Sequence, residues 1–226
     1  MATVAQDTFT DTSGTLLANH TPDIGTGWTI SGAAGGEDPD IQSNQLRMGG
    51  WEGPEYAVEG TDIGSDEMDV SARTWLTSTE STRTIRVTGR LPSATANAAN
   101  MYLGRRVSGS GQTIYTLRKR VGGSESQLGS YTDGNAPGTQ QVMKLALRTD
   151  AKKLYVDGTE RISSPDESLT GNRFAGLGGG RIESRMDDWL SEDVPPPTGP
   201  DAFAQRQPRE DWLLRTHRVA EHQGSA

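Results

Sequence analysis

The stretch that decides the fold spans nine residues and reads Leu154-Tyr155-Val156-Asp157-Gly158-Thr159-Glu160-Arg161-Ile162. β-Branched and aromatic residues stand on both sides of the dipeptide Asp157-Gly158. Both central residues of a two-residue hairpin turn need a positive φ, and Asp-Gly is a preferred pair for this position. The stretch therefore predicts an antiparallel β-hairpin.

A similar pattern extends outward from this hairpin. Polar and apolar residues alternate in 83–89 and in 141–148, and Tyr115, Leu117 and Val121 share one face of a further segment. A period of two indicates half-buried strands with one wet face. About ten or more such segments, joined by glycine-rich turns, predict an all-β sandwich or barrel.

The β-rich part ends at a proline cluster, Pro195-Pro196-Pro197-Thr198-Gly199-Pro200. We predict a β-domain at 1–192, a Pro-rich linker at 193–207 and a docking helix with its tail at 208–226. A lone helix of this length is marginal in water, so we expect it to dock onto its own sandwich, a neighbouring copy or a larger partner. Its predicted docking residues are Trp212, Leu213, Thr216 and Val219.

The charges are unevenly distributed along the chain, whose net charge is −8. Residues 1–70 hold thirteen acids and one base, whereas residues 81–120 hold eight bases and no acid. These two segments either neutralise each other within one sandwich or meet between copies in an assembly. The acidic balance and the few aromatics near the bases speak against a nucleic-acid partner.

The sequence also disfavours proteins that rely on cysteine chemistry and proteins that associate with a membrane. The chain has no cysteine, which excludes disulfides, cysteine-based zinc sites and thiol catalysis. The first residues lack the basic and apolar regions of a signal peptide. No apolar run approaches the ~20 residues that cross a bilayer, so we expect no membrane partner.

Several motifs beyond the hairpin carry a family resemblance. They are Lys144-Leu145-Ala146-Leu147, Asp166-Glu167-Ser168-Leu169-Thr170-Gly171, Phe174-Ala175-Gly176-Leu177 and Met186-Asp187-Asp188-Trp189-Leu190. With the hairpin, they resemble the LamG-like, concanavalin A-like lectin/glucanase jelly roll. The opening Asp7-Thr8-Phe9, with Gly27-Trp28, looks like the start of such modules in bacteriophage virion proteins. The resemblance implies a two-sheet antiparallel jelly-roll sandwich, followed here by the linker and short helix.

The residues offer little for catalysis. Enzymatic members of this fold carry a Glu-x-Asp-x-x-Glu strand, and Glu67-Met68-Asp69-Val70-Ser71-Ala72 begins like it but ends in Ala72. Glycoside hydrolysis needs two carboxyls across the scissile bond, so we expect no enzyme activity. His217 and His222 are five residues apart and do not share a helix face. We expect all three histidines, including His20, to be solvated or to cap.

Binding residues are harder to assign from the sequence. Calcium is the one plausible cofactor, from Asp38 with Asp40 or from Asp187 with Asp188, but neither pair makes a site alone, and we assign none. Aromatic rings stack on sugars, so four rings are candidate glycan contacts if they lie exposed. The alternative is that most of them pack in the sandwich or in an interface. These rings are Trp51, Tyr56, Tyr102 and Tyr131.

The sequence thus predicts a non-enzymatic bacteriophage virion accessory protein, located in the virion as a head-decoration or minor tail protein. Its expected partners are other virion proteins (major capsid or tail proteins), reached through the C-terminal tail, further copies of itself, and a host surface glycan. The alternative is a free carbohydrate-binding lectin module. The sequence leaves the head or tail position and the glycan open.

Overall fold

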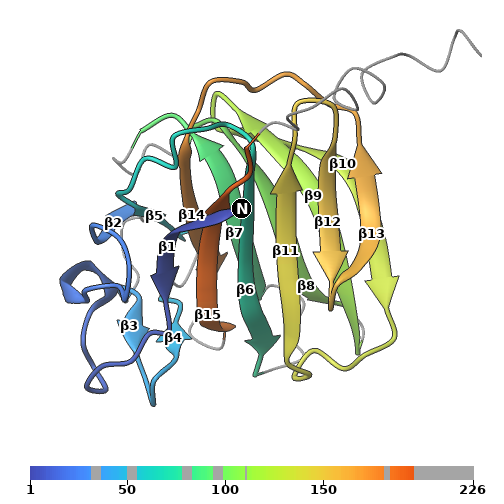
Figure 1. The fold of residues 1–226 in the computed structure, drawn as a ribbon. Coiled ribbons are helices and arrows are strands. Elements are labelled where there is room, and N and C mark those ends of the chain that lie inside the picture. The colour runs from blue at the N-terminus through green and yellow to red at the C-terminus, as the bar shows by residue number, and fades with distance from the viewer. Residues whose placement is uncertain are drawn as a thin grey trace, which may run out of the picture. The chain divides into compact units, whose positions relative to one another are not determined.

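The computed structural model describes residues 1–31, 37–49, 55–77, 83–93, 99–109, 111–180 and 184–195. Two antiparallel sheets make up the first of two units, Met1–Val194. The predicted all-β, two-sheet antiparallel sandwich is therefore confirmed (Figure 1). The second unit is Pro195–Ala226, so the predicted linker at 193–207 begins inside the first unit, where Asp193 ends the last strand; residues 196–226, with the predicted docking helix, lie outside the described residues.

The first sheet has eight strands. In spatial order they are β13 (Thr159–Ser164), β12 (Lys152–Val156), β11 (Gln141–Leu147), β6 (Met68–Leu76), β15 (Ser184–Asp193), β4 (Leu46–Arg47) and β3 (Asp40–Ile41). The eighth, β1 (Ala2–Asp7), pairs with the end of β15, so the first and last strands of the sandwich are neighbours. A short 3₁₀ helix, η1 (Leu17–Asn19), lies between β1 and the next strand.

The second sheet has seven strands. In spatial order they are β10 (Ser124–Asp133), β9 (Gln112–Val121), β8 (Met101–Gly109), β7 (Thr84–Leu91), β14 (Phe174–Gly180), β5 (Glu55–Glu59) and β2 (Trp28–Ser31). Each pairing is antiparallel. Within the described part of the chain, no helix is long and apolar enough to cross a membrane.

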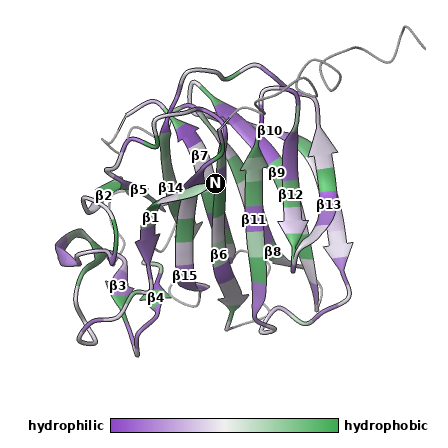
Figure 2. Ribbon diagram, in the orientation of Figure 1, coloured by the Kyte–Doolittle hydropathy of each residue, from purple (hydrophilic) through white to green (hydrophobic). Residues whose placement is uncertain are grey.

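The inner faces of the two sheets form the core. Alternate residues such as Val70 on β6, Leu145 on β11 and Val87 on β7 are fully buried there, as the period-two pattern predicts. Figure 2 shows apolar positions recurring along β6 and β11. Trp189 is also fully buried, and its ring meets that of Trp28 edge-on with centroids 4.9 Å apart.

The predicted Asp-Gly hairpin is present. Val156 pairs with Thr159, so Asp157 and Gly158 form the two-residue loop between β12 and β13. Both have positive φ, 48° and 76°. The Asp157 carboxylate accepts hydrogen bonds from Val142 N at 2.8 Å and Gln141 Nε2 at 3.0 Å, which ties the turn to β11.

Candidate functional site

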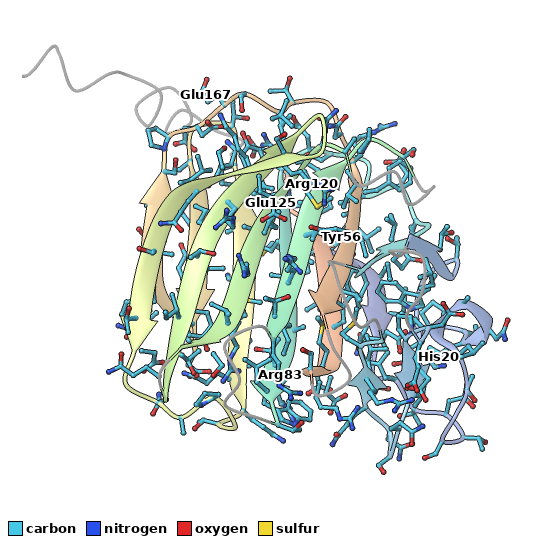
Figure 3. The ribbon with its side chains drawn as sticks, turned by 180° about the vertical axis from the view of Figure 1, so that it is seen from behind. His20, Tyr56, Arg83, Arg120, Glu125 and Glu167 are labelled. Carbon is cyan, nitrogen blue, oxygen red and sulfur yellow. The ribbon has the colours of Figure 1, made fainter. Side chains whose placement is uncertain are left out.

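A group of charged side chains covers the outer face of the seven-stranded sheet. Arg86 points outward because its neighbours Ile85 and Val87 point into the core, and the cross-strand register places Arg105 opposite Arg86. The same alternation turns further side chains to this face. We call it the arginine face, and it comprises Tyr56 (β5), Arg86 (β7), Arg105 (β8), Arg118 and Arg120 (β9) and Glu125 (β10), three of which are labelled in Figure 3.

The arginine face is concave. Tyr56 and Glu125 lie on strands separated by four others, which spans about 24 Å across a flat sheet at about 4.8 Å per strand. Two side chains cannot bridge that distance, yet Tyr56 Oη lies 3.1 Å from Glu125 Oε1. The sheet must therefore curve so that the outer sides of β5 and β10 approach each other. Figure 3 shows the two labelled residues close together on this side.

Tyr56 is the centre of the contacts on this face. Its hydroxyl donates to Glu125 Oε1 and accepts from Arg120 Nη1 at 3.0 Å. The guanidinium carbons of Arg86 and Arg120 lie 5.6 and 5.2 Å from the ring centroid, which favours the positive charges electrostatically. Arg86 reaches the ring across β14 because the residue between them is Gly178, which has no side chain.

The positive charge of the arginine face exceeds its negative charge. Glu125 is the one acid on it among the described strand residues, and it lies 3.0 Å from Arg118 Nε and 4.0 Å from Arg86 Nη2. Arg105 forms no hydrogen bond or ion pair with any described residue. Burial lowers the pKa of Arg105, and the charges of Arg86 and Arg118 lower it further.

Several polar atoms on this face are buried without a hydrogen-bond partner among the described residues. They are Nε of Arg86, Arg105 and Arg120, and Oγ1 of Thr88 and Thr116. Leaving such groups unsatisfied costs about 1–3 kcal/mol each. Protein atoms cover them, so water or a ligand that brings acceptors reaches them only when neighbouring side chains move. Tyr56 also belongs to a small apolar cluster on this face, together with Val58, Leu91, Met101 and Leu103.

The structure decides between the two placements left open for the predicted aromatic rings. Tyr56 and Tyr102 do not lie exposed but are 2% and 0% exposed. Tyr102 points into the core side, where its hydroxyl donates to Asp166 Oδ1 at 2.5 Å. Tyr131 is half-buried and stacks on Tyr115, with centroids 6.4 Å apart. Trp51 lies outside the described residues, so Tyr56 is the predicted ring that the structure places on the arginine face.

The arginines of this face were missed as site residues by the sequence reasoning. Their signal was present, because the eight bases without an acid in 81–120 include Arg86, Arg105, Arg118 and Arg120. The predicted neutralisation by residues 1–70 is not what these four side chains show. Arg118 and Arg86 face Glu125, which lies outside that acidic segment. An acid of residues 1–70 such as Asp69 instead forms ion pairs with Lys144 and Arg148, which lie outside 81–120.

Of the two roles expected for His20, the structure shows the capping one: His20 is the C-cap of η1, with its N–H donating to Leu17 O at 3.2 Å, and its ring is not solvated. It is 6% exposed, with Nε2 2.9 Å from Asp7 Oδ1 and Nδ1 3.0 Å from Asp11 Oδ2. Asp7 is fully buried and also accepts from Trp28 Nε1 at 2.7 Å. Burial lowers the pKa of His20, but the hydrogen bonds to Asp11 and Asp7 outweigh it and the pKa is raised. This cluster anchors η1 to the sandwich.

The carboxylates tested for catalysis are held by neighbours. Glu67 Oε1 accepts from Thr149 N at 3.1 Å and from Thr149 Oγ1 at 2.5 Å. Asp69 lies on the outer face of the eight-stranded sheet, 2.6 Å from Arg148 and 3.2 Å from Lys144. These contacts help to hold β6 against its neighbour β11.

The predicted calcium residues also have protein partners. Asp40 receives two hydrogen bonds from Arg47, at 2.6 and 2.9 Å, and Asp188 forms an ion pair with Arg73. Asp38 is exposed, and burial raises the pKa of Asp187. Within the described ranges there is no group of three or more His, Asp or Glu that could hold a metal ion. The predicted docking residues Trp212, Leu213, Thr216 and Val219 lie outside those ranges.

The two antiparallel sheets define the fold as an all-β jelly-roll sandwich, and solved structures of this fold are similar to it. The carbohydrate-binding module CBM66 from Bacillus subtilis is similar, with a TM-score of 0.60 and 16% identity over 74% of this chain and 96% of that one. A structure reported with endo-acting O-glycanases of the human gut microbiota has a TM-score of 0.61 and 13% identity, over 86% of this chain and 100% of that one.

The carbohydrate recognition domain of Emp46p, in a potassium-bound form, has a TM-score of 0.52 and 12% identity, over 74% of this chain and 89% of that one. No protein-family model matches the sequence. No curated protein matches it either. At these identities the likeness shows the fold alone.

Proposed function

We propose that this protein is a non-enzymatic carbohydrate-binding module whose glycan lies on the arginine face. The observation that carries the proposal is a concave sheet face with buried polar atoms that have no partner among the described residues. Sugar hydroxyls are both donors and acceptors and can satisfy such groups. The fold supports the proposal, because similar structures include a carbohydrate-binding module and a carbohydrate recognition domain.

The absence of catalysis is part of this proposal. Glycoside hydrolysis needs two carboxyl groups facing one bond. Among the described strand residues, the arginine face carries a single acid, Glu125, which already contacts Tyr56 and Arg118. An isolated, paired carboxylate of this kind positions neighbours and binds hydroxyls. No cofactor is included, so binding is expected to persist with a chelator present.

The test is affinity electrophoresis of the full chain in gels containing a panel of polysaccharides, with EDTA. We expect retardation by at least one polysaccharide and at least a ~10-fold weaker interaction in Arg120→Met, since a lost charged hydrogen bond costs about 1.5–3 kcal/mol. The matched control is Lys153→Met, a cation on the outer side of β12 that pairs with Glu160. Retardation by no polysaccharide, or an equal loss in Lys153→Met, contradicts the proposal.

The setting of the module is the second part of the proposal. The opening residues Asp7-Thr8-Phe9 and Gly27-Trp28 resemble modules of bacteriophage virion proteins, which supports a place in the virion, as head decoration or minor tail protein. Docking of Trp212, Leu213, Thr216 and Val219 onto other virion proteins would display many copies and raise avidity for a host glycan. Quantitative mass spectrometry of purified particles tests it: absence of the protein would leave the free lectin.

A further inference from the structure

The arginine face carries more positive charge than the binding of neutral sugar hydroxyls would require. Four guanidinium groups, from Arg86, Arg105, Arg118 and Arg120, share one carboxylate, Glu125. A guanidinium keeps its charge at any pH at which proteins fold. The repulsion among these groups therefore persists in the unliganded protein and falls when an anion arrives.

Arg105 is the clearest case. It is half-buried, it has no hydrogen-bond or ion-pair partner among the described residues, and it lies between the like charges of Arg86 and Arg118. Its Nε is fully buried and unpaired. Removing a charge from water without a partner is unfavourable. A position that costs folding energy in this way and adds no internal contact is typical of a ligand-binding residue.

Arg86 is an independent observation of the same kind. Its side chain is 6% exposed, with Nη1 donating to Thr84 Oγ1 at 2.9 Å and the ring of Tyr56 on one side. Its nearest acid, Glu125, is 4.0 Å away, and its buried Nε has no partner among the described residues. Arg86 on β7 and Arg105 on β8 are cross-strand partners in the register. Each carries an Nε donor that has no partner among the described residues.

We propose that the arginine face recognises saccharides that carry carboxylate or sulfate groups, with the anion bound between Arg105 and Arg86. This inference rests on the proposed function and names its ligand class. The planar fork of a guanidinium fits a carboxylate or sulfate through two parallel hydrogen bonds. Hydroxyls of the same saccharide would meet the Oγ1 atoms of Thr88 and Thr116, which face outward on the neighbouring strands.

A saccharide fits this face better than a nucleic acid. The whole chain carries a net charge of −8, which repels a continuous phosphate backbone. Single-stranded nucleic acid also needs aromatic rings on which successive bases stack. The rings described on this side of the sheet are few: Tyr56 is 2% exposed and flanked by Arg86 and Arg120, and the half-buried Phe174 packs against the apolar cluster around it.

The experiment compares polygalacturonate, dextran sulfate and neutral dextran in affinity electrophoresis of the full chain. We expect retardation by polygalacturonate or dextran sulfate, weakened at least ~10-fold in Arg105→Met and less in Arg105→Lys, which keeps the charge but loses the bidentate fork. The two polyanions separate carboxylate from sulfate recognition. Lys153→Met, which removes a cation from the other sheet, should change nothing. Added salt should weaken the retardation steeply.

Thermal unfolding of the same variants guards against a merely structural explanation. Because Arg105 has no partner among the described residues, Arg105→Met should unfold at the wild-type temperature or above it. A clear fall in Tm would make Arg105 a structural residue and overturn the inference. Retardation by neither polyanion, or equal retardation by single-stranded DNA, would also overturn it. Binding of a neutral polysaccharide in the wider panel would then leave the proposed function standing, whereas no binding to any would remove both.

Discussion

Two consecutive arginines, Arg105 and Arg106, have opposite environments because side chains alternate across a strand. Arg106 points into the sandwich, is 0% exposed and donates to the backbone oxygens of Thr74, Pro137 and Thr139. Its donors on Nη1 and Nη2 are thereby satisfied by loops of the core. Arg105 points outward to the concave face, without such carbonyls. The buried guanidinium of Arg106 therefore contributes to the fold, while that of Arg105 has no hydrogen-bond partner among the described residues.

At the residue scale, His20 makes the stability of the protein depend on pH. Its pKa is raised in the folded state, so the stability it contributes is fully present below its ordinary value of about 6.5 and is lost as pH rises through the folded pKa. Relative to His20→Gln, the wild type should therefore lose stability between about pH 6 and about pH 8. Urea unfolding midpoints at the two pH values measure this.

Lys152 adds a second pH dependence that the wild type and His20→Gln share. Burial lowers the pKa of this fully buried lysine to about 8. A depressed lysine pKa makes stability rise with pH above that value in both proteins, so the effect cancels when the two are compared. Identical pH profiles for the wild type and His20→Gln would show that the contacts of His20 with Asp7 and Asp11 do not depend on its charge.

At the scale of one element, the β12–β13 hairpin depends on the backbone of Gly158. Its φ is +76°, and a Cβ built there meets no atom within 4 Å, so only backbone strain opposes a side chain. We expect Gly158→Ala to lower the free energy of unfolding by about 1 kcal/mol. Chemical denaturation measures the change.

Gly134 is the matched control for this hairpin variant. A Cβ at Gly134 also meets nothing within 4 Å, but its φ is outside the left-handed range. Gly134→Ala should therefore be neutral or slightly stabilising, since it reduces only the freedom of the unfolded chain. Equal destabilisation in both variants would show that the loss comes from added side-chain bulk and that the turn conformation is not its cause.

At the scale of the whole molecule, the sandwich is complete before the second unit begins. β15 ends at Asp193 and pairs with β1, β4 and β6, and Val194 N donates to Glu67 O at 3.1 Å. A chain ending at residue 195 should therefore keep the Tm and the polysaccharide binding of the full chain, while losing any attachment to a particle. Unfolding of this shortened chain would contradict that and make residues 196–226 part of the fold.

The sequence by itself determined the features that local chemistry controls. Asp157-Gly158 set a turn because its backbone angles suit few other pairs, and alternation in 83–89 and 141–148 set strands and their core faces. The number and spacing of such segments predicted a sandwich or barrel, and the resemblance to the concanavalin A-like jelly roll implied the two sheets. The sequence also shows directly that Ala72 replaces the third acid of the catalytic motif, because this depends on the residue type at one position.

The tertiary structure alone decided the site. Tyr56 and Glu125 are 69 residues apart and meet only because the seven-stranded sheet curves, and no local pattern encodes that curvature. The same holds for Asp7, Asp11 and His20, whose burial depends on Trp28 and the packing around it. The sequence left open whether the candidate aromatic rings are exposed or packed, and the structure buries Tyr56 and Tyr102. Long-range packing therefore made arginines, rather than aromatic rings, the main polar groups of this face.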